Sequence, residues 1–413
     1  MIGRTNAVSK PGVELSLVVS VTSGAAVTAT KGSKTVNGTA AGGSCVLSLP
    51  EAGTWSVKAT LGGQTSDTKN VSVVDSYAVA LTFFSATITV EVDSGASVTL
   101  KKGSTTVATK TSTGTAVFTV KETGTYTVEA TKNGQTVSGS VNVVSGTTSY
   151  TLALSFVSST LNDNDWSVIK SVSDAGQGAN YWSIGDRKAV TLNGTVNAWT
   201  LSNVTTYAFI IGFNHNATVE GSNRIHFQLA KTALSGGADV CLCDNYYGNT
   251  SGGFRMNTSQ SNSGGWASSN MRTAICGTSL SSYSGTILAV IPAELRAVLK
   301  SVTKYTNNTG NSTAASAVTA TTDYFFLLSE YEVFGSTTYA NSNEASKQAQ
   351  YAYYSAGNSK IKYKHNATST AAIWWLRSPL ASNSGGFVYV NAGGTVDYNT
   401  AAYSRGFAPG FCV

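Results

Sequence analysis

Ser23-Gly24-Ala25-Ala26-Val27-Thr28 is followed 71 residues later by Ser94-Gly95-Ala96-Ser97-Val98-Thr99. Such self-similarity at a fixed offset indicates two copies of one structural unit. Three more pairs keep the offset of 71: Lys31-Gly32-Ser33 with Lys102-Gly103-Ser104, Gly53-Thr54-Trp55-Ser56-Val57 with Gly124-Thr125-Tyr126-Thr127-Val128, and Gly63-Gln64-Thr65 with Gly134-Gln135-Thr136.

Each copy alternates short strands with tight turns. Residues 125–130 alternate polar and apolar side chains with the period of a half-buried strand. Lys132-Asn133-Gly134-Gln135 then carries the Asn-Gly pair of a two-residue hairpin turn. About seven such strands in roughly 70 residues are typical of a small Ig-like sandwich. We therefore predict all-β Ig-like modules at residues 13–84 and 85–156, acting as rigid spacers, after an N-terminal segment 1–12.

The composition of the whole chain agrees with many short strands. Its 413 residues include 41 glycines and 5 prolines, with 41% hydrophobic and 12% charged residues, which excludes a disordered chain. The net charge of +6 is spread thinly, without the basic stripe that a nucleic-acid partner requires. There is also no run of 18 apolar residues, so we expect no membrane insertion.

The cysteines and histidines point to no cofactor and no metal. The five cysteines are an odd number without a Cys-x-x-Cys pair, and we interpret them as free, mostly buried thiols. His215 and His226 have no carboxylate or cysteine companions at ligand spacing, so we interpret them as ordinary polar or core histidines.

The sequence composition changes at residue 157, where Trp, Tyr, Asn and short helical patterns begin to appear. We therefore predict a single α+β domain over 157–413. Leu295, Val298, Leu299 and Val302 follow the spacing of one apolar helix face. Residues 269–276 and 342–355 are two further helix candidates.

The end of the chain contains a second hairpin. Residues 387–390 and 395–398 flank the glycine-rich turn Asn391-Ala392-Gly393-Gly394. Tyrosine mixed with serine, glycine and asparagine is the composition of an adaptable binding surface, because tyrosine offers rigid contact area and the small polar residues offer hydrogen bonds. A solvated loop followed by an edge strand has the same composition and remains an alternative.

Four phrases of the C-terminal domain resemble a family known only as a domain of unknown function, with a C-type-lectin-like fold. They are Ile184-Gly185-Asp186-Arg187 before 190–194, Gly264-Gly265-Trp266 before Met271-Arg272-Thr273, residues 326–335, and Trp374-Trp375-Leu376-Arg377-Ser378-Pro379. The resemblance implies a C-type-lectin-like fold for residues 157–413. The Glu-Pro-Asn, Gln-Pro-Asp and Trp-Asn-Asp motifs of calcium-dependent lectins are absent, so calcium-mediated sugar binding is not expected.

The closing stretch is also similar to the variable proteins of diversity-generating retroelements, which include phage tropism determinants. In that group asparagine codons are scrambled, which implies a variable ligand-binding segment at residues 380–407 here. The implied variable contacts are Asn383, Ser384, Tyr389, Asn391, Asp397, Tyr398, Asn399, Tyr403 and Arg405. The implied fixed frame is Trp374, Trp375, Arg377, Gly393, Pro409 and Phe411.

Motifs of enzymes are scarce. No His-Glu-x-x-His, Gly-x-Ser-x-Gly or phosphate loop occurs. If residues 326–334 form a strand, Glu330 and Glu332 share one face, and such a carboxylate pair would suggest glycoside hydrolysis. Since the phrase belongs to the family frame, we interpret both as structural. The stretch Asn162-Asp163-Asn164-Asp165 lacks the later glutamate of a calcium loop and is interpreted as a solvated turn.

The expectation from the sequence is therefore a receptor-binding protein of a phage virion, at a tail tip or fibre, and not an enzyme. The N-terminal stretch shows no secretory signal, as expected for a virion protein made in the host cytoplasm. The expected partners are a host cell-surface protein or glycan and, through the N-terminal region, other virion proteins; a homotrimer would suit a fibre. The alternatives are a bacterial cell-surface adhesin and a glycan-processing enzyme on the same fold.

Overall fold

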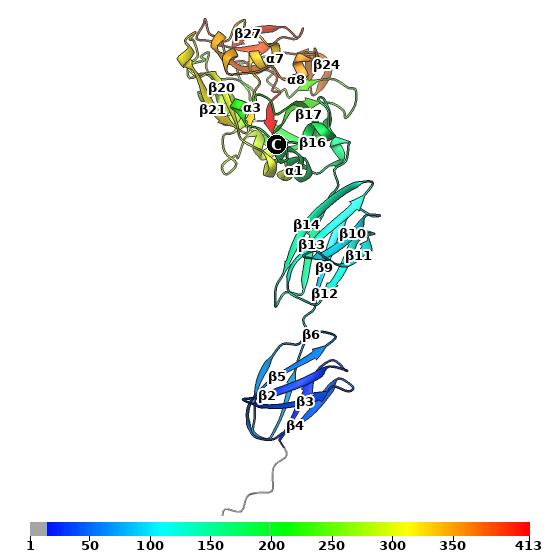
Figure 1. Ribbon diagram of the computed structural model, residues 1–413. Helices are drawn as coiled ribbons and strands as arrows, with labels where there is room; N and C mark the ends of the chain where they lie inside the picture. Colours follow the sequence, from blue (N-terminus) through cyan, green and yellow to red (C-terminus); the bar gives the residue numbers. More distant parts are fainter. Residues whose placement is uncertain (1–14, 198) are drawn as a thin grey trace, which may run out of the picture. The chain divides into compact units, whose positions relative to one another are not determined.

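The computed structural model describes residues 15–197 and 199–413 and shows a β-rich, multidomain chain (Figure 1). The chain divides into two compact units that meet between Phe156 and Val157, here called unit 1 and unit 2. The predicted N-terminal segment 1–12 lies outside the described residues. None of the described helices is long and apolar enough to cross a membrane.

The first repeat of unit 1 consists of two sheets around one core. One sheet has the order β4-β1-β8, and the other has the order β3-β2-β5-β6, with β7 also paired to β5. Trp55 is fully buried between them. The strands are β1 (Leu15–Ser20), β2 (Ala26–Lys31), β3 (Lys34–Thr39), β4 (Ser44–Leu49), β5 (Gly53–Leu61), β6 (Gln64–Thr65), β7 (Lys69–Val73) and β8 (Ser76–Ala80).

The second repeat has the same arrangement, with sheets β12-β9-β15 and β11-β10-β13-β14 around a core of its own. The predicted turn is confirmed: Lys132 pairs with Gln135, and Asn133 and Gly134 both have positive φ, as a type I′ turn requires. The strands are β9 (Ala86–Val92), β10 (Ser97–Lys102), β11 (Thr105–Thr111), β12 (Gly114–Val120), β13 (Gly124–Lys132), β14 (Gln135–Val143) and β15 (Ser149–Ala153).

Unit 2 is built on a five-stranded sheet with the order β16-β17-β18-β28-β22. The last strand of the chain, β28, lies inside this sheet, and its neighbours come from distant parts of the sequence. The five strands are β16 (Arg187–Val196), β17 (Trp199–Phe213), β18 (Ile225–Lys231), β22 (Phe325–Phe326) and β28 (Gly410–Cys412).

Three small sheets complete unit 2, with the orders β19-β23-β24, β20-β21 and β25-β26-β27. In Figure 1, β27 lies at the end of unit 2 opposite α1 and β16. The strands are β19 (Val240–Cys241), β20 (Val302–Asn307), β21 (Val318–Asp323), β23 (Lys362–Lys364), β24 (Ala367–Ala372), β25 (Trp374–Pro379), β26 (Gly386–Val390) and β27 (Val396–Thr400). The helices are α1 (Trp166–Asp174), α2 (Gly178–Tyr181), α3 (Ala217–Glu220), α4 (Gly265–Ser268), α5 (Ile287–Val290), α6 (Ala293–Val298), α7 (Glu330–Phe334) and α8 (Ala352–Ser355). Other helical turns are the 3₁₀ turns η1 (Leu161–Asp163), η3 (Ala315–Ala317) and η4 (Ser342–Ser346) and the π-helix η2 (Met271–Cys276).

The predicted helices of unit 2 are only partly correct. The apolar face over 295–302 is wrong beyond Val298, because α6 ends there and Val302 belongs to β20. The backbone N–H of Lys300 donates to Cys412 O (2.9 Å), which draws the chain out of the helix and toward β28. The candidate at 269–276 is a π-helix from Met271, and the candidate at 342–355 is divided into η4 and α8.

Candidate functional site: the C-terminal hairpin and its buried support

The hairpin predicted near the C-terminus is confirmed as β26 and β27. Tyr389 pairs with Asp397, and its hydroxyl lies 3.0 Å from Asp397 Oδ2. Strand β27 pairs with β26 alone within the part of the chain that the structure describes, so it is the edge of its sheet. Behind the hairpin, the Trp375 ring meets Tyr389 edge to face at 6.0 Å.

The turn of this hairpin depends on Gly394. Its φ is +84°, and a Cβ there would lie 2.9 Å from Ile361 Cγ1. Gly393, which the family resemblance placed in the fixed frame, is exposed and has no positive φ. Asn391 holds the turn as well, since its Oδ1 accepts from the N–H groups of Gly393 (2.9 Å) and Thr395 (3.1 Å). The conformational demand for glycine therefore falls on position 394.

The predicted variable contacts are mostly at the surface. Tyr398 is 46% exposed, whereas Tyr389 is 7% exposed and belongs to the buried side of the hairpin. Asn383, Asn391 and Asn399 each accept a hydrogen bond from a nearby backbone N–H, which fixes their side chains locally. Eight of the nine are exposed or partly exposed: Asn383, Ser384, Asn391, Asp397, Tyr398, Asn399, Tyr403 and Arg405.

The predicted frame residues, apart from Gly393, are buried. The indole N–H of Trp374 donates to Lys360 O (2.9 Å), and that of Trp375 donates to Phe254 O (3.1 Å). Phe411 of β28 stacks on Phe227 of β18 with ring centroids 5.2 Å apart. Trp374, Trp375, Arg377 and Phe411 have no exposed surface, and Pro409 is buried.

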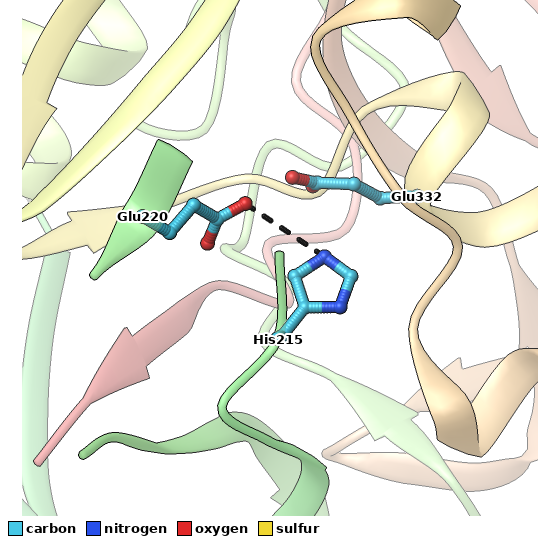
Figure 2. A group of neighbouring side chains, drawn as sticks. All are labelled: His215, Glu220 and Glu332. Atoms are coloured by element: carbon cyan, nitrogen blue, oxygen red, sulfur yellow. Dashed lines mark ion pairs between the residues drawn. The ribbon is translucent and has the colours of Figure 1, made fainter. Parts of the chain in front are cut away.

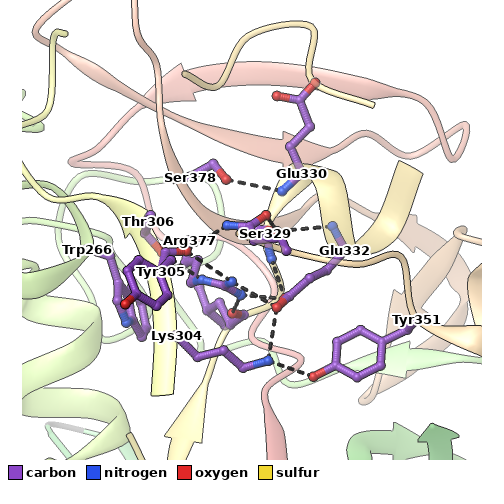
Figure 3. A network of polar contacts seen from close by, with 12 residues as sticks. Trp266, Lys304, Tyr305, Thr306, Ser329, Glu330, Glu332, Tyr351, Arg377 and Ser378 are labelled. Carbon is purple, nitrogen blue, oxygen red and sulfur yellow. Dashed lines mark hydrogen bonds and ion pairs between the residues drawn. The ribbon is translucent and has the colours of Figure 1, made fainter. Parts of the chain in front are cut away.

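Arg377 is the centre of a buried ionic network (Figure 3). Both of its terminal nitrogens contact the carboxylate of Glu332, with Nη2 2.8 Å from Oε1. Lys304 Nζ lies 2.9 Å from the same Oε1 and 2.6 Å from Glu220 Oε2. The flanking cations lower the pKa of Glu332 against the opposing effect of its burial. These four side chains tie α3, β20, α7 and β25 together, and β25 pairs with β26 of the hairpin.

His215 adds an imidazole to this network, and Figure 2 shows it beside Glu220 with Glu332 close by. His215 Nε2 lies 3.7 Å from Glu220 Oε1, and the potential ligand atoms of the three residues lie within 4.8 Å of one another. The prediction that His215 lacks carboxylate companions is therefore wrong, because the fold brings Glu220 and Glu332 close to it. Burial lowers the pKa of His215 to about 3, so its imidazole is neutral.

The His215 group is a poor metal centre, because its carboxylates already have cationic partners. Lys304 bridges Glu220 and Glu332, and Arg377 occupies the rest of the Glu332 carboxylate. A divalent ion would share the space with two buried positive charges, which repel it. We therefore assign no metal to His215, Glu220 and Glu332.

Glu330 and Glu332 do not lie on a strand, which corrects the geometry considered for a carboxylate pair. Ser329 begins α7 with a capping box, in which its hydroxyl accepts from Glu332 N and Glu332 accepts from Ser329 N. The Glu330 carboxylate accepts from the backbone N–H groups of Thr338, Tyr339 and Ala340. Both glutamates are fully buried and hydrogen-bonded, as a structural role requires.

The sulfur atoms of Cys241 and Cys243 lie 3.8 Å apart, as expected for residues two positions apart in an extended chain, whose side chains share one face. His226, too, has a cysteine companion, because Cys412 Sγ lies 3.2 Å from its Nδ1. The described cysteines are all buried, and desolvation raises the pKa of the Cys412 thiol to about 12.

The loop 244–254 is a part of this surface that the sequence did not reveal. Buried Asp244 accepts from Tyr246 N (3.0 Å), Phe254 N (3.2 Å) and Ser404 Oγ (2.9 Å), so it ties the loop to the C-terminal segment. Tyr246 at the surface of the loop is 51% exposed. The signal available was the pair Tyr246-Tyr247 among small polar residues, the same composition that marked 380–407.

Comparison with known proteins finds that part of unit 2 is similar to a described family. The model of the family "Domain of unknown function (DUF6273)" matches residues 239–413, less than half of the chain. Three of the four phrases quoted above lie in this range, and the phrase at 184–194 precedes it. No curated protein is detectably similar in sequence.

Two solved structures show faint likeness. The TIE protein of Bacillus anthracis is 12% identical with a TM-score of 0.18, and the match covers 48% of this chain and 45% of that one. A family CBM26 module from Eubacterium rectale Amy13K, solved with maltoheptaose, is 13% identical with a TM-score of 0.14 over 34% of this chain and 92% of that one. The chain thus spans under half the length of the TIE protein, and neither score is high enough to define a fold.

Proposed function

We propose that residues 157–413 form a C-type-lectin-like domain that displays segment 380–407 as a replaceable ligand-binding surface. The two repeats of unit 1 are, in this proposal, Ig-like spacers. The chain acts as a receptor-binding protein of a phage virion and recognises a host cell-surface protein or glycan without performing chemistry. The segment is diversified by a retroelement that scrambles asparagine codons.

The observation that supports the proposal is the difference in burial between the predicted frame residues and the predicted variable contacts. Five of the six frame residues are buried, whereas eight of the nine candidate contacts reach the surface. Substitutions at exposed positions usually change stability by less than about 0.5 kcal/mol, so many side chains are tolerated there. The buried network around Arg377 holds the support in place while the surface changes.

Deep sequencing of the 3′ end of this gene across a phage population tests the proposal. The expected result is substitutions confined to the codons of exposed residues within 380–407, at positions that match adenines of a nearby template repeat. The codons of Trp374, Trp375 and Arg377 should be invariant in the same reads. An invariant segment, or substitutions spread evenly over buried and exposed codons, would refute diversification.

A further inference from the structure

Arg405 presents a cation at the surface without a partner of its own. Its Cζ lies 5.0 Å from the ring centroid of Tyr403 and 5.7 Å from that of Tyr247. Its Nε is buried and has no hydrogen-bond partner within residues 15–197 and 199–413, where no ion pair of Arg405 occurs either. Cation–π contacts of this kind orient a guanidinium but leave its charge unneutralised.

Lys364 brings a second positive charge to the same tyrosine. Its Nζ lies 4.3 Å from the ring centroid of Tyr247, so two cations share one aromatic ring. The ring is fixed, because its hydroxyl accepts from the backbone N–H of Ile373 (2.8 Å). Two like charges beside one partly buried ring create a local positive potential, which a ligand anion would relieve.

The acidic side chains of the adjoining segments are already engaged. Asp244 accepts from Ser404 Oγ and from backbone N–H groups of its own loop. Asp397 accepts from the Tyr389 hydroxyl (3.0 Å) and from Tyr398 N (2.8 Å). Neither forms an ion pair with Arg405 or Lys364 in the described chain, so the positive charge is available to a ligand.

The backbone around these side chains is preorganised. Gly248 N donates to Ser404 O and Ser404 N donates to Asn249 O, both at 2.8 Å, and Arg405 N donates to Phe254 O at 3.1 Å. These bonds join the loop 244–254 to the end of the segment 380–407. A site held by its own backbone loses little freedom when a ligand binds.

We propose that Arg405, Lys364, Tyr247 and Tyr403 form an anion-binding subsite, and that the ligand is an anionic polysaccharide. Carboxylate and phosphate groups both match a guanidinium fork. The exposed ring of Tyr246 (51%), in the loop that these backbone bonds join to Ser404 and Arg405, offers amphipathic surface, which suits a sugar ring with an apolar face and hydroxyl edges. This inference rests on the proposed display function and extends its surface to residues outside 380–407.

The test is binding of soluble polymers to the full chain by affinity electrophoresis. Polygalacturonate supplies carboxylates, phosphomannan supplies phosphates, and dextran is the neutral control. We expect one or both anionic polymers to bind and dextran not to bind, with binding that weakens as salt is raised. Preference for one anionic polymer identifies which anion the subsite takes.

Variants connect the binding to the subsite. Arg405→Gln and Lys364→Gln should each weaken binding about 10-fold or more, because a charge-assisted hydrogen bond is lost. Arg405→Lys should retain part of the affinity, whereas Lys170→Gln, which removes a partly exposed lysine of α1, should retain all of it. Tryptophan fluorescence checks that each variant is folded.

Three outcomes would overturn the inference: no binding of either anionic polymer, equal binding by wild type and Arg405→Gln, or equally strong binding of poly-L-glutamate, which would replace the sugar by an acidic peptide. The sequencing test of diversification is independent of all three. A failure here therefore removes the anionic ligand and leaves the display surface standing.

Discussion

Replacing Glu332 by glutamine should destabilise unit 2 by about 3–5 kcal/mol, the usual cost of removing one member of a buried ion pair. The carboxylate contacts Arg377 and Lys304, and none of the three side chains has exposed surface. Glutamine has nearly the same shape, and its oxygen can still accept from Ser329 N, so the cap of α7 is kept. What is lost is the negative charge. The buried cations Lys304 and Arg377 then keep one ion-pair partner between them, the Glu220 carboxylate beside Lys304.

Urea unfolding of the full chain, followed by tryptophan fluorescence, measures this loss. Six of the seven tryptophans belong to unit 2, so the signal reports mainly on that unit. The matched control is Asp174→Asn, which breaks the partly exposed pairs of Asp174 with Lys170 and Lys300. Exposed pairs contribute about 0–1 kcal/mol, so the control should stay within that range.

A double variant makes the test sharper. Adding Lys304→Met to Glu332→Gln removes one of the stranded cations, so the double variant should be more stable than the sum of the two single changes predicts. A cost for Glu332→Gln no larger than that of Asp174→Asn would refute the reasoning, because the network would then hold no uncompensated charge.

Three further predictions concern the stability of unit 2. Gly394→Ala should lower the free energy of unfolding by about 1–3 kcal/mol, because alanine is strained at φ +84° and its Cβ meets Ile361. Gly393→Ala should lower it by less than about 0.5 kcal/mol, and equal losses in thermal or urea unfolding would contradict this. Asp244→Ala should lower the free energy of unfolding by about 2–4 kcal/mol, since Ser404 Oγ and backbone N–H groups lose a buried acceptor. Protease cleavage within 244–254 should become faster, and an unchanged cleavage rate would contradict the prediction. Stability should fall steeply below about pH 4.5. The lowered pKa of Glu332 makes its contribution disappear as pH falls, and the unfolded chain takes up protons at His215 and His226, whose folded pKa values are both lowered, that of His215 to about 3. Between about pH 4.5 and 6.5 the raised pKa values of Glu220 and Glu344, both about 7, oppose the effect of the two histidines, because the folded state then holds two extra protons on these carboxylates. A pH series of urea midpoints should therefore be flat there, and His215→Gln should flatten the acid limb; a midpoint that keeps rising from pH 4.5 to 6.5 would contradict this sign.

Local sequence patterns predicted the structure correctly where residues close together in the chain determine it. The turn at Asn133-Gly134 follows from two residues that tolerate positive φ, and the hairpin of β26 and β27 follows from alternation on both sides of a glycine-rich turn. The apolar stripe from Leu295 to Val302 failed for the opposite reason. All four residues are buried, but a tertiary hydrogen bond from Lys300 to β28 ends the helix, and no local pattern encodes it.

The buried network was also out of reach. Lys304 meets Glu220 across 84 residues and Arg377 meets Glu332 across 45, so sequence spacing carried no sign of either contact. The phrase around Glu332 and the phrase around Arg377 were each recognised as parts of the frame. Only the fold shows that Glu332 and Arg377 form an ion pair with each other.

If segment 380–407 is diversified as proposed, the position of β28 has a consequence for defective copies. Residues 410–412 are synthesised after 380–407, yet they fill the gap between β18 and β22 in the main sheet. A premature stop or a shifted reading frame inside segment 380–407 therefore deletes an interior strand and leaves two apolar sheet edges open. Such a chain is a substrate for proteases rather than for assembly. Only chains that are read through in frame can close the sheet, so under the proposed diversification the fold would select against defective copies.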